Sequence, residues 1–232
     1  MKKYKYQMHT HTTPCSLCGH LTPEDLCASL LENGYDGAVI TNHFYHGNSG
    51  IDRSENTSWE QFVKIYEDSF LEFKREGEKH GIDMIFSIEE SVYPGTEILC
   101  YGVTPKILYD NPQLIKGECD EWIRVMRENG VVIIQAHPYR EAFYIPNPGP
   151  LPLELVDGIE VFNRGNSPIY NERAMALAEQ NPHLIRTSSA DTHSCDTVGV
   201  GGIITSKRIT NEKELAAILR SRDFELIIPE AE

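Results

Sequence analysis

The chain has 232 residues, which is enough for one sizeable hydrophobic core and does not require a second domain. Its formal net charge of -14 argues against a general nucleic-acid-binding surface, which needs a basic face, but leaves a nucleotide open as a small substrate. The sequence has no apolar run long enough to span a bilayer and no secretory signal pattern, so we expect a cytoplasmic protein without a membrane segment.

Six cysteines are scattered along the chain, too sparsely for the disulfide framework of a small secreted module. Only Cys15 and Cys18 have C-x-x-C spacing. This pair could be half of a structural zinc site, although no second pair has matching spacing. It could also be a redox motif, although Gly19 and His20 separate it from the next predicted helix. Both alternatives stay open from the sequence.

Short apolar strands alternate with helices along the chain. The first helix is predicted from the N-cap residue Thr22, the first-turn residue Pro23 and a stop at Gly34. A capping box at 58–61 opens a long helix whose aromatic face we expect to pack in the core. Further helices are predicted at 118–129, 171–180 and 211–221. Strands or extended segments are predicted at 4–8, 37–41, 83–88, 97–103, 131–136, 158–162, 184–188, 201–204 and 224–228.

This alternation is typical of a parallel α/β architecture, either a closed barrel or an open doubly wound sheet. An open sheet that binds a nucleotide would favour a glycine-rich phosphate loop after the first strand. The first strand instead ends in histidines, which favours the barrel. We find no internal repeat or domain boundary, so residues 1–232 are predicted to form a single domain.

Polar side chains follow most of the predicted strands. His9 and His11 alternate along an extended backbone and therefore point to the same side. The full set of strand-end residues is His9, His11, His43, Glu89, His137, Asn163, Asp191 and His193. In a parallel barrel the carboxyl ends of the strands meet at one rim, where such folds carry out their chemistry. The sequence therefore predicts one cluster at that rim.

Imidazole nitrogen and carboxylate oxygen are ligands that suit Zn, Mn or Fe. Six or seven ligands are too many for one tetrahedral zinc ion. A carboxylate such as Glu89 can bridge two ions, so we expect two, and at most three, divalent metals per chain. The remaining histidines are expected to be ordinary loop residues, although His20 is close enough to the first turn to be a further candidate ligand, as is Cys18.

These motifs resemble the polymerase and histidinol phosphatase (PHP) superfamily over most of the chain. The matching motifs are H-T-H-T at 9–12, I-T-N-H at 40–43, I-E at 88–89, Q-A-H-P-Y-R at 135–140, D-G-I-E-V-F-N at 157–163 and S-A-D-T-H at 189–193. Their order and spacing together are specific, whereas any one of them alone is not. The resemblance implies a distorted (β/α)7 barrel, a two- or three-metal site and phosphoesterase activity.

The resemblance also implies how the ligands are shared. The first metal would be held by His9, His11, Glu89 and Asp191. Glu89 would bridge to a second metal with His137, and a third would be held by the two remaining histidines, His43 and His193.

The sequence departs from the family pattern in three places. The acidic residue or histidine that often follows the first H-x-H is missing, and Cys18 or His20 could replace it. The usual T-D-H reads Thr41-Asn42-His43. The histidine that commonly follows the third strand is absent, and the stretch 97–101 lies in its region.

We therefore expect a hydrolase that cleaves the phosphate ester of a small phosphorylated substrate with a metal-bound hydroxide. His43, His193 and Arg140 are the predicted catalytic residues, because either imidazole could protonate the leaving oxygen. Arg140 and Asn163 are the predicted substrate-binding residues, with Arg140 as a bidentate fork for phosphate. A surface arginine in a loop is the alternative for Arg140.

Two other functions remain open at this stage. One is a barrel amidohydrolase that uses similar metals to cleave C–N bonds. The other is a metal-stabilised binding module without turnover, which the missing ligands would favour. Strong stabilisation by metal without any hydrolysis would indicate the binding module.

Overall fold

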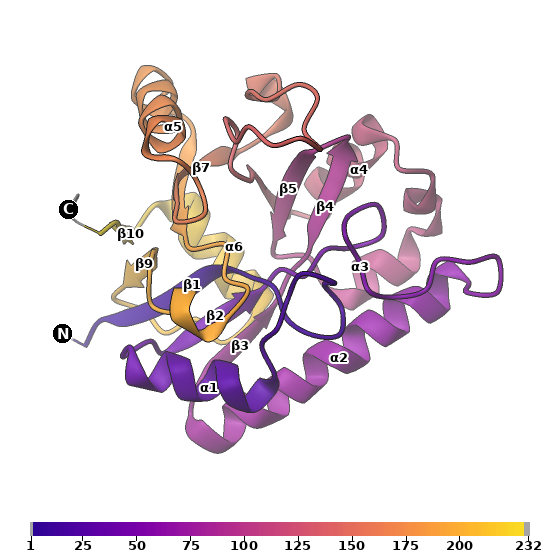
Figure 1. The fold of residues 1–232 in the computed structure, drawn as a ribbon, viewed down its shortest axis with the longest axis horizontal. Helices are drawn as coiled ribbons and strands as arrows, with labels where there is room; N and C mark the ends of the chain where they lie inside the picture. The colour runs from indigo at the N-terminus through magenta and orange to yellow at the C-terminus, as the bar shows by residue number, and fades with distance from the viewer. Residues whose placement is uncertain (1, 230–232) are drawn as a thin grey trace.

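The computed structural model describes residues 2–229, in which strands and helices alternate along the chain (Figure 1). The strands are β1 Tyr4–Thr10, β2 Gly37–Ile40, β3 Asp83–Phe86, β4 Glu89–Tyr93, β5 Thr96–Tyr101, β6 Val132–Gln135, β7 Gly158–Asn163, β8 Ile185–Ser189, β9 Gly202–Thr205 and β10 Phe224–Ile227. The α-helices are α1 Pro23–Glu32, α2 Trp59–His80, α3 Pro105–Asp110, α4 Cys119–Glu128, α5 Pro168–Gln180 and α6 Glu212–Ser221. Three short 3-10 helices are η1 Pro112–Lys116, η2 Leu153–Leu155 and η3 Cys195–Thr197.

The helix starts predicted from capping residues are confirmed for α1 and α2. The Thr22 hydroxyl accepts a hydrogen bond from the Asp25 N–H, and Pro23 occupies the first turn. Ser58 and Gln61 form the capping box of α2, which ends at Gly81 in the left-handed conformation (φ 72°). Helix α5 begins at Pro168, three residues earlier than predicted, and α3 was not predicted.

The strands form two five-stranded sheets and not one closed barrel, which corrects the predicted closed architecture. Their orders are β10-β9-β1-β2-β3 and β4-β5-β6-β7-β8. Strands β1, β2 and β3 are mutually parallel, as are β6, β7 and β8, whereas β5 is antiparallel to both of its neighbours. Among the described residues, backbone pairing between the two sheets is limited to isolated bridges, Thr10 with Thr192 and His43 with Glu89.

The chain itself changes sheets between β3 and β4, and this explains why the hydrogen-bonded ladder is interrupted. The Ser87 N–H donates to the Ile40 carbonyl of the first sheet, whereas the Ile88 carbonyl accepts from the Cys100 N–H of the second. Glu89 therefore begins the antiparallel β4–β5 hairpin. The sequence places it at the end of the third strand, and this prediction is wrong. The seam between the sheets is the place where the predicted ligands meet.

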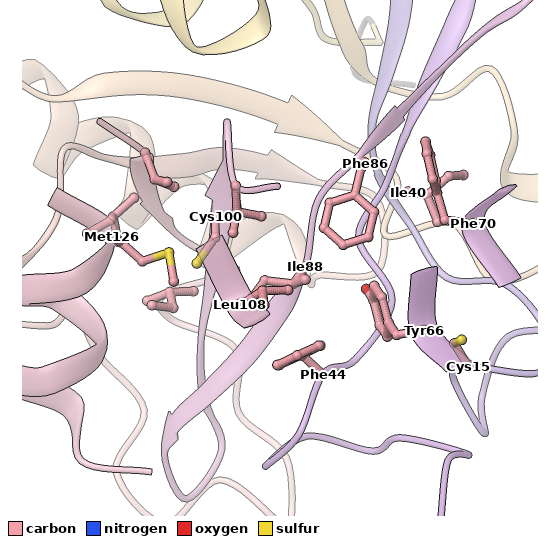
Figure 2. Close-up of a cluster of buried hydrophobic side chains, with 14 of the residues drawn as sticks. Cys15, Ile40, Phe44, Tyr66, Phe70, Phe86, Ile88, Cys100, Leu108 and Met126 are labelled. Atoms are coloured by element: carbon pink, nitrogen blue, oxygen red, sulfur yellow. The ribbon is translucent and has the colours of Figure 1, made fainter. Parts of the chain in front are cut away.

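Helices α1 and α2 cover one side of β1, β2 and β3 (Figure 1). The aromatic face of α2 is core, as predicted. Phe44 packs edge-on against Phe62 and Tyr66, with ring centroids 5.1 Å apart in each pair. Tyr66 also contacts Phe86 of β3 (Figure 2). This apolar cluster packs behind the loop that carries Asn42 and His43.

A second buried cluster consists mainly of strand residues from both sheets together with residues of α6. It fills the space between the sheets, where a closed barrel would have its interior. No helix among residues 2–229 is long and apolar enough to cross a membrane. The predicted single domain spans residues 1–232, of which 1 and 230–232 lie outside the part of the chain that the structure describes.

Candidate metal centre

The predicted ligands at the strand ends come together in a buried cluster at the seam. His9 Nε2 lies 2.9 Å from His11 Nε2 and 3.1 Å from Glu89 Oε1. His11 Nε2 lies 3.2 Å from Asp191 Oδ1. All four side chains are buried. Atoms that share one zinc or similar ion at about 2 Å are themselves about 3 Å apart, so these spacings fit a common cation.

Glu89 also faces a second group of side chains. Its Oε2 lies 2.9 Å from His43 Nδ1, and its Oε1 lies 3.4 Å from His137 Nε2. Glu97, at the start of β5, approaches the same two rings at 3.4 Å each. Sequence reasoning did not select Glu97, although the stretch 97–101 had been noted as the region where the family histidine is missing. The structure places a carboxylate there.

Three hydrogen bonds fix how the histidine rings face the cluster. His9 Nδ1–H donates to Glu160 Oε1 at 3.0 Å, and His193 Nδ1–H donates to the Asp191 carbonyl at 2.6 Å. The Ser16 hydroxyl donates to Asn42 and accepts from the His43 N–H, so the remaining partner of its oxygen, His11 Nδ1, must be the donor. Each of these three rings therefore carries its proton on Nδ1, so that Nε2 is the nitrogen open to a metal when the ring is neutral, as partners behind metal-binding histidines normally arrange.

Glu160 is a second residue that sequence reasoning missed. It lies in the middle of β7 and is fully buried. Its Oε1 holds His9, while its Oε2 accepts from the His137 N–H at 2.9 Å and from Asn163 Nδ2 at 3.0 Å. The available signal was an acidic residue inside the apolar D-G-I-E-V-F strand. Glu160 thus positions the cluster from behind.

Asn42 accounts for one departure from the family pattern. Its Oδ1 accepts from the Thr12 N–H at 2.6 Å and from the Ser16 hydroxyl at 2.9 Å, and its Nδ2 donates to the Thr12 hydroxyl at 2.7 Å. An amide can both donate and accept, whereas an aspartate can only accept. Through these hydrogen bonds the Asn42 side chain connects the loop after β2 to the loop after β1.

Two residues of the cluster have a left-handed backbone that non-glycine residues rarely adopt. His137 has a φ of 30° and Asp191 a φ of 55°. Such conformations cost on the order of 1–3 kcal/mol and persist where the surroundings fix them, which is common at functional sites. Here the His137 N–H is held by Glu160 and its carbonyl by the Arg140 N–H at 3.0 Å.

The carboxylates of the cluster are held ionised and act on the neighbouring rings. Burial lowers the pKa of His9 and of His43, but the nearby carboxylates outweigh burial and raise both. Burial raises the pKa of Glu89, but the positive charge of His9 and His43 outweighs burial and holds it well below its usual range. Burial likewise opposes ionisation of Asp191, yet His9, His11 and Arg140 hold its pKa well below the usual range. Burial, reinforced by the charge of neighbouring His43, lowers the pKa of His11 to about 3. The His11 ring is thus free to act as a ligand.

Unpaired buried atoms provide an independent test of the metal assignment. Among the described residues, Glu89 Oε1, Glu89 Oε2 and His43 Nδ1 are buried and make no hydrogen bond, although His43 Nδ1 lies 2.9 Å from Glu89 Oε2 and His9 Nε2 lies 3.1 Å from Glu89 Oε1. Leaving such atoms unsatisfied costs about 1–3 kcal/mol each, more for charged groups, so a native site needs something to satisfy them. A divalent cation does so for all three. The donor set therefore fits bound metal.

The candidate ligand atoms form three overlapping groups in which all atoms lie within 4.8 Å of one another. Their members are His9, His11 and Glu89; His43, Glu89 and Glu97; and His11, Cys18, His43 and His193. Asp191 lies against the first group and His137 against the second. His20 is not part of any group; its side chain is exposed, and its N–H donates to the His193 carbonyl at 2.9 Å.

Arg140 lies beside the cluster, where its Nη2 is 2.7 Å from Asp191 Oδ2. Its guanidinium also donates to Asn163 Oδ1 and Asn166 Oδ1, both at 2.9 Å. Asn163 is buried behind Arg140 and is engaged on both sides of its amide. Direct contact of Asn163 with a substrate stays a prediction, while the observed contacts assign it to holding Arg140 in place.

A cavity of about 590 Å³ opens over the cluster. His43, Glu89, His137, Asp191 and His193 reach its floor and wall. The loops that follow β2 and β6 contribute to its edge, at 46–48 and at Tyr144. Of the histidines expected to be ordinary loop residues, His46 is hydrogen-bonded to the buried Glu90 at 2.7 Å, whereas His80 is the last residue of α2 and does not lie in a loop.

No protein-family model and no curated protein sequence matches the chain. Solved structures do match it. A two-domain protein from Bacteroides vulgatus that contains a predicted PHP-like metal-dependent phosphoesterase aligns with 98% of this chain, at 15% identity and a TM-score of 0.70. The chain spans 65% of that protein.

Two further structures align with this chain over nearly their whole length. A candidate metal-dependent phosphoesterase from Bifidobacterium adolescentis aligns over 92% of this chain and 95% of its own, at 15% identity and a TM-score of 0.57. An amidohydrolase from Chromobacterium violaceum aligns over 91% and 96%, at 14% identity and a TM-score of 0.56. At these identities the comparison establishes the fold. The chain has the α/β fold of PHP-like phosphoesterase and amidohydrolase structures.

Proposed function

We propose that the protein is a metal-dependent phosphoesterase acting on a small phosphorylated substrate. The observation that carries this proposal is the convergence of His9, His11, Glu89 and Asp191 beneath an open cavity, with both oxygens of Glu89 buried and without a hydrogen bond. Divalent ions bound there would supply a nucleophile at neutral pH and neutralise charge on phosphoryl oxygens. The similarity to structures described as phosphoesterases supports this choice of reaction.

The chain's own residues would orient the substrate. Arg140 lies on the cavity wall with its guanidinium held by Asn163, Asn166 and Asp191, so it is pre-organised and does not need to be ordered by the substrate. It places a fixed positive charge beside the cluster, where a phosphate oxygen would approach. The buried cluster below excludes water from all sides except the cavity, which strengthens this attraction.

His43 and His193 remain the proposed catalytic imidazoles. Both line the cavity, and His193 is the more exposed of the two. Burial lowers the pKa of His193, but its contacts with Cys18 and Asp191 outweigh burial and raise it. A proton on His193 is therefore available near neutral pH for the oxygen of the leaving group, as long as the ring is not engaged otherwise.

The experiment is hydrolysis of an aryl phosphate by protein purified with its metals. We expect activity that is abolished by a chelator and restored by Mn or Zn, and a Glu89→Gln variant that loses at least 100-fold in kcat/KM, on the scale of about 3 kcal/mol for an electrostatic contact in a site. Metal analysis would give the number of ions per chain. Full activity in the presence of chelator would reject the proposal.

The similarity to an amidohydrolase structure supports a second candidate, cleavage of a C–N bond at the same cluster. The two reactions differ in the inhibitors that resemble them. Inhibition by inorganic phosphate or vanadate, but not by hydroxamates, indicates phosphoester chemistry, and the reverse pattern indicates amide or amine hydrolysis.

A further inference from the structure

The third group of candidate ligands contains one cysteine thiol and three histidines but no carboxylate. Cys18, His43 and His193, with His11 behind them, offer atoms within 4.8 Å of one another. They come from the loops after β1, β2 and β8, which are far apart in the sequence. Cys18 also lines the cavity, so this group forms the rim of the site.

The loop that carries Cys18 is tightly built. Its backbone is fixed by hydrogen bonds from the Ser16 N–H to the Thr12 carbonyl at 3.0 Å and from the Gly19 N–H to the Ser16 carbonyl at 3.1 Å. A Cβ atom on Gly19 would lie 2.7 Å from the Thr12 nitrogen and 2.8 Å from the His11 carbonyl carbon. Only glycine permits this close approach of the loop to the backbone of His11 and Thr12, and Cys18 is the residue directly before Gly19.

Cys15 lies on the other side of the same loop. It is fully buried in the apolar core next to Tyr66 (Figure 2), and both cysteines are free thiols. A chelating C-x-x-C pair would need both sulfur atoms on one side. The structure therefore separates the two cysteines, leaving Cys18 alone among the described cysteines in a group of candidate ligands.

We propose that Cys18 is a thiolate ligand in a rim metal site together with His43 and His193. A ligand set with sulfur and two imidazoles is softer than the His and carboxylate set below it, so the rim site selects Zn over Mn. The inference deepens the proposed function by assigning a ligand and a metal preference to the same site. With the rim metal bound, both His43 and His193 would be ligands, so the proton-donor role proposed for these two rings would apply only to the protein without that metal.

Cobalt binding tests this directly, because a thiolate bound to Co²⁺ gives an intense near-ultraviolet charge-transfer band that nitrogen and oxygen ligands do not give. Metal-free protein titrated with Co²⁺ is expected to develop the band in proportion to one equivalent per chain. Cys18→Ser should lose the band and bind one equivalent of metal fewer. Cys195→Ser, which removes an exposed cysteine two residues after His193, is the matched control and should keep the band.

A second variant guards against a folding defect. Cys18→Asp retains an anionic ligand and should bind the metal without the band, with an unchanged thermal unfolding temperature of the metal-free protein. A band that persists in Cys18→Ser or Cys18→Asp would overturn the proposal, as would cobalt binding by the wild-type protein without the band.

The same protein preparation separates this inference from the proposed function. Phosphatase activity without the band leaves the phosphoesterase proposal standing and rejects the thiolate ligand. The band without hydrolysis of any phosphoester supports the rim site and counts against the phosphoesterase. No cobalt binding at all rejects the rim site, and the phosphoesterase proposal is then decided by the chelator experiment with Mn or Zn.

Discussion

Glu160 illustrates how a single buried residue organises the site. It accepts hydrogen bonds from His9, His137, Asn163 and Ser189, which come from four different segments of the chain. Burial opposes its ionisation, but the charge of His9 and the hydrogen bond from His9 outweigh burial and lower the pKa of Glu160. An ionised acceptor that satisfies this many donors fixes both the His9 ring and the strained backbone at His137.

Replacement of Glu160 by glutamine should therefore impair the site, although Glu160 is not itself one of the candidate ligands. We expect Glu160→Gln to lower the free energy of unfolding by about 1–3 kcal/mol, because one amide cannot accept from all four donors. Metal affinity should fall by about 10–100-fold, as for other residues behind metal ligands. Denaturant unfolding and competition with a chelating dye measure these effects. Glu172→Gln, on the exposed surface of α5, is the control; equal effects of the two variants would contradict the role given to Glu160.

At the residue scale, the sequence predicts which candidate ligands lie together, because polar residues at the ends of apolar strands are visible in the pattern. His9, His11, Glu89, His137 and Asp191 are indeed brought together. Their supporting residues could not be predicted in the same way. Whether an acidic residue within a strand faces the site or the outside depends on register and twist, which the sequence does not display.

The long helix α2 is the element that supports the site from below. Its buried face carries the aromatic side chains that pack against Phe44, and the Tyr66 hydroxyl donates to the Asn42 carbonyl at 2.7 Å. The loop that carries His43 is thereby tied to the helix. The start of α2 depends on the capping box formed by Ser58 and Gln61.

Ser58→Ala should destabilise the protein by about 0.5–2 kcal/mol, because the first turn of α2 loses an acceptor for the Gln61 N–H. Thermal or urea unfolding measures the loss. Ser58→Asp keeps an acceptor at the same position and should retain most of the stability. Metal binding should be unchanged in both variants, since the cap lies at the surface; a selective loss of metal would contradict this account.

At the element scale, most helices and strands follow from caps, periodicity and short apolar runs. The capping box of α2 and the first-turn proline of α1 are local features, so the sequence alone reveals them. The partner of each strand is a non-local choice. The β4–β5 hairpin starts at Glu89 because the chain changes sheets at Ser87 and Ile88, and no Gly, Pro, Asn or Asp at these positions marks the change in the sequence.

The whole molecule depends on the contact between its two sheets. The pairing of β1 with β2 becomes irregular between Gln7 and Thr10, and Met8 lies within this interruption. Its carbonyl accepts a hydrogen bond from the hydroxyl of Tyr101, on β5 of the other sheet, at 3.0 Å. Both residues are fully buried. This bond joins the sheets one residue before His9.

Tyr101→Phe should lower the free energy of unfolding by about 1–3 kcal/mol at neutral pH, because the Met8 carbonyl loses its partner. Burial raises the pKa of Tyr101 well above its usual value of 10.0. Because the folded-state pKa of Tyr101 is raised, its contribution to the free energy of unfolding is fully present below the unfolded-state pKa. This contribution is lost as the pH rises toward the folded-state pKa. The difference between wild type and variant should therefore shrink above about pH 10.

Urea unfolding at neutral and at alkaline pH measures both parts of this prediction. Tyr4→Phe, at a partly buried position on β1, is the control and should change stability little. A difference between wild type and Tyr101→Phe that grows as the pH rises would contradict the assignment.

The sequence indicates the α/β class but not how the sheets close. A regular alternation of strands and helices is equally compatible with one barrel and with two sheets that meet at a seam, because the pattern records which residues are apolar and not which strands pair. The isolated bridges at Thr10 and His43 are single contacts at the ends of short strands. Nothing in the residue pattern distinguishes them from a continuous ladder.

The position of the cluster at this seam has a consequence for stability as well as for chemistry. His9 lies on β1, and His11 and His43 follow β1 and β2 of one sheet, whereas Glu89 and Glu97 lie on β4 and β5 and His137 follows β6 of the other. Metal ions bound between these groups, as proposed, would cross-link the two sheets. Removal of the metal would then lower the free energy of unfolding as well as the activity.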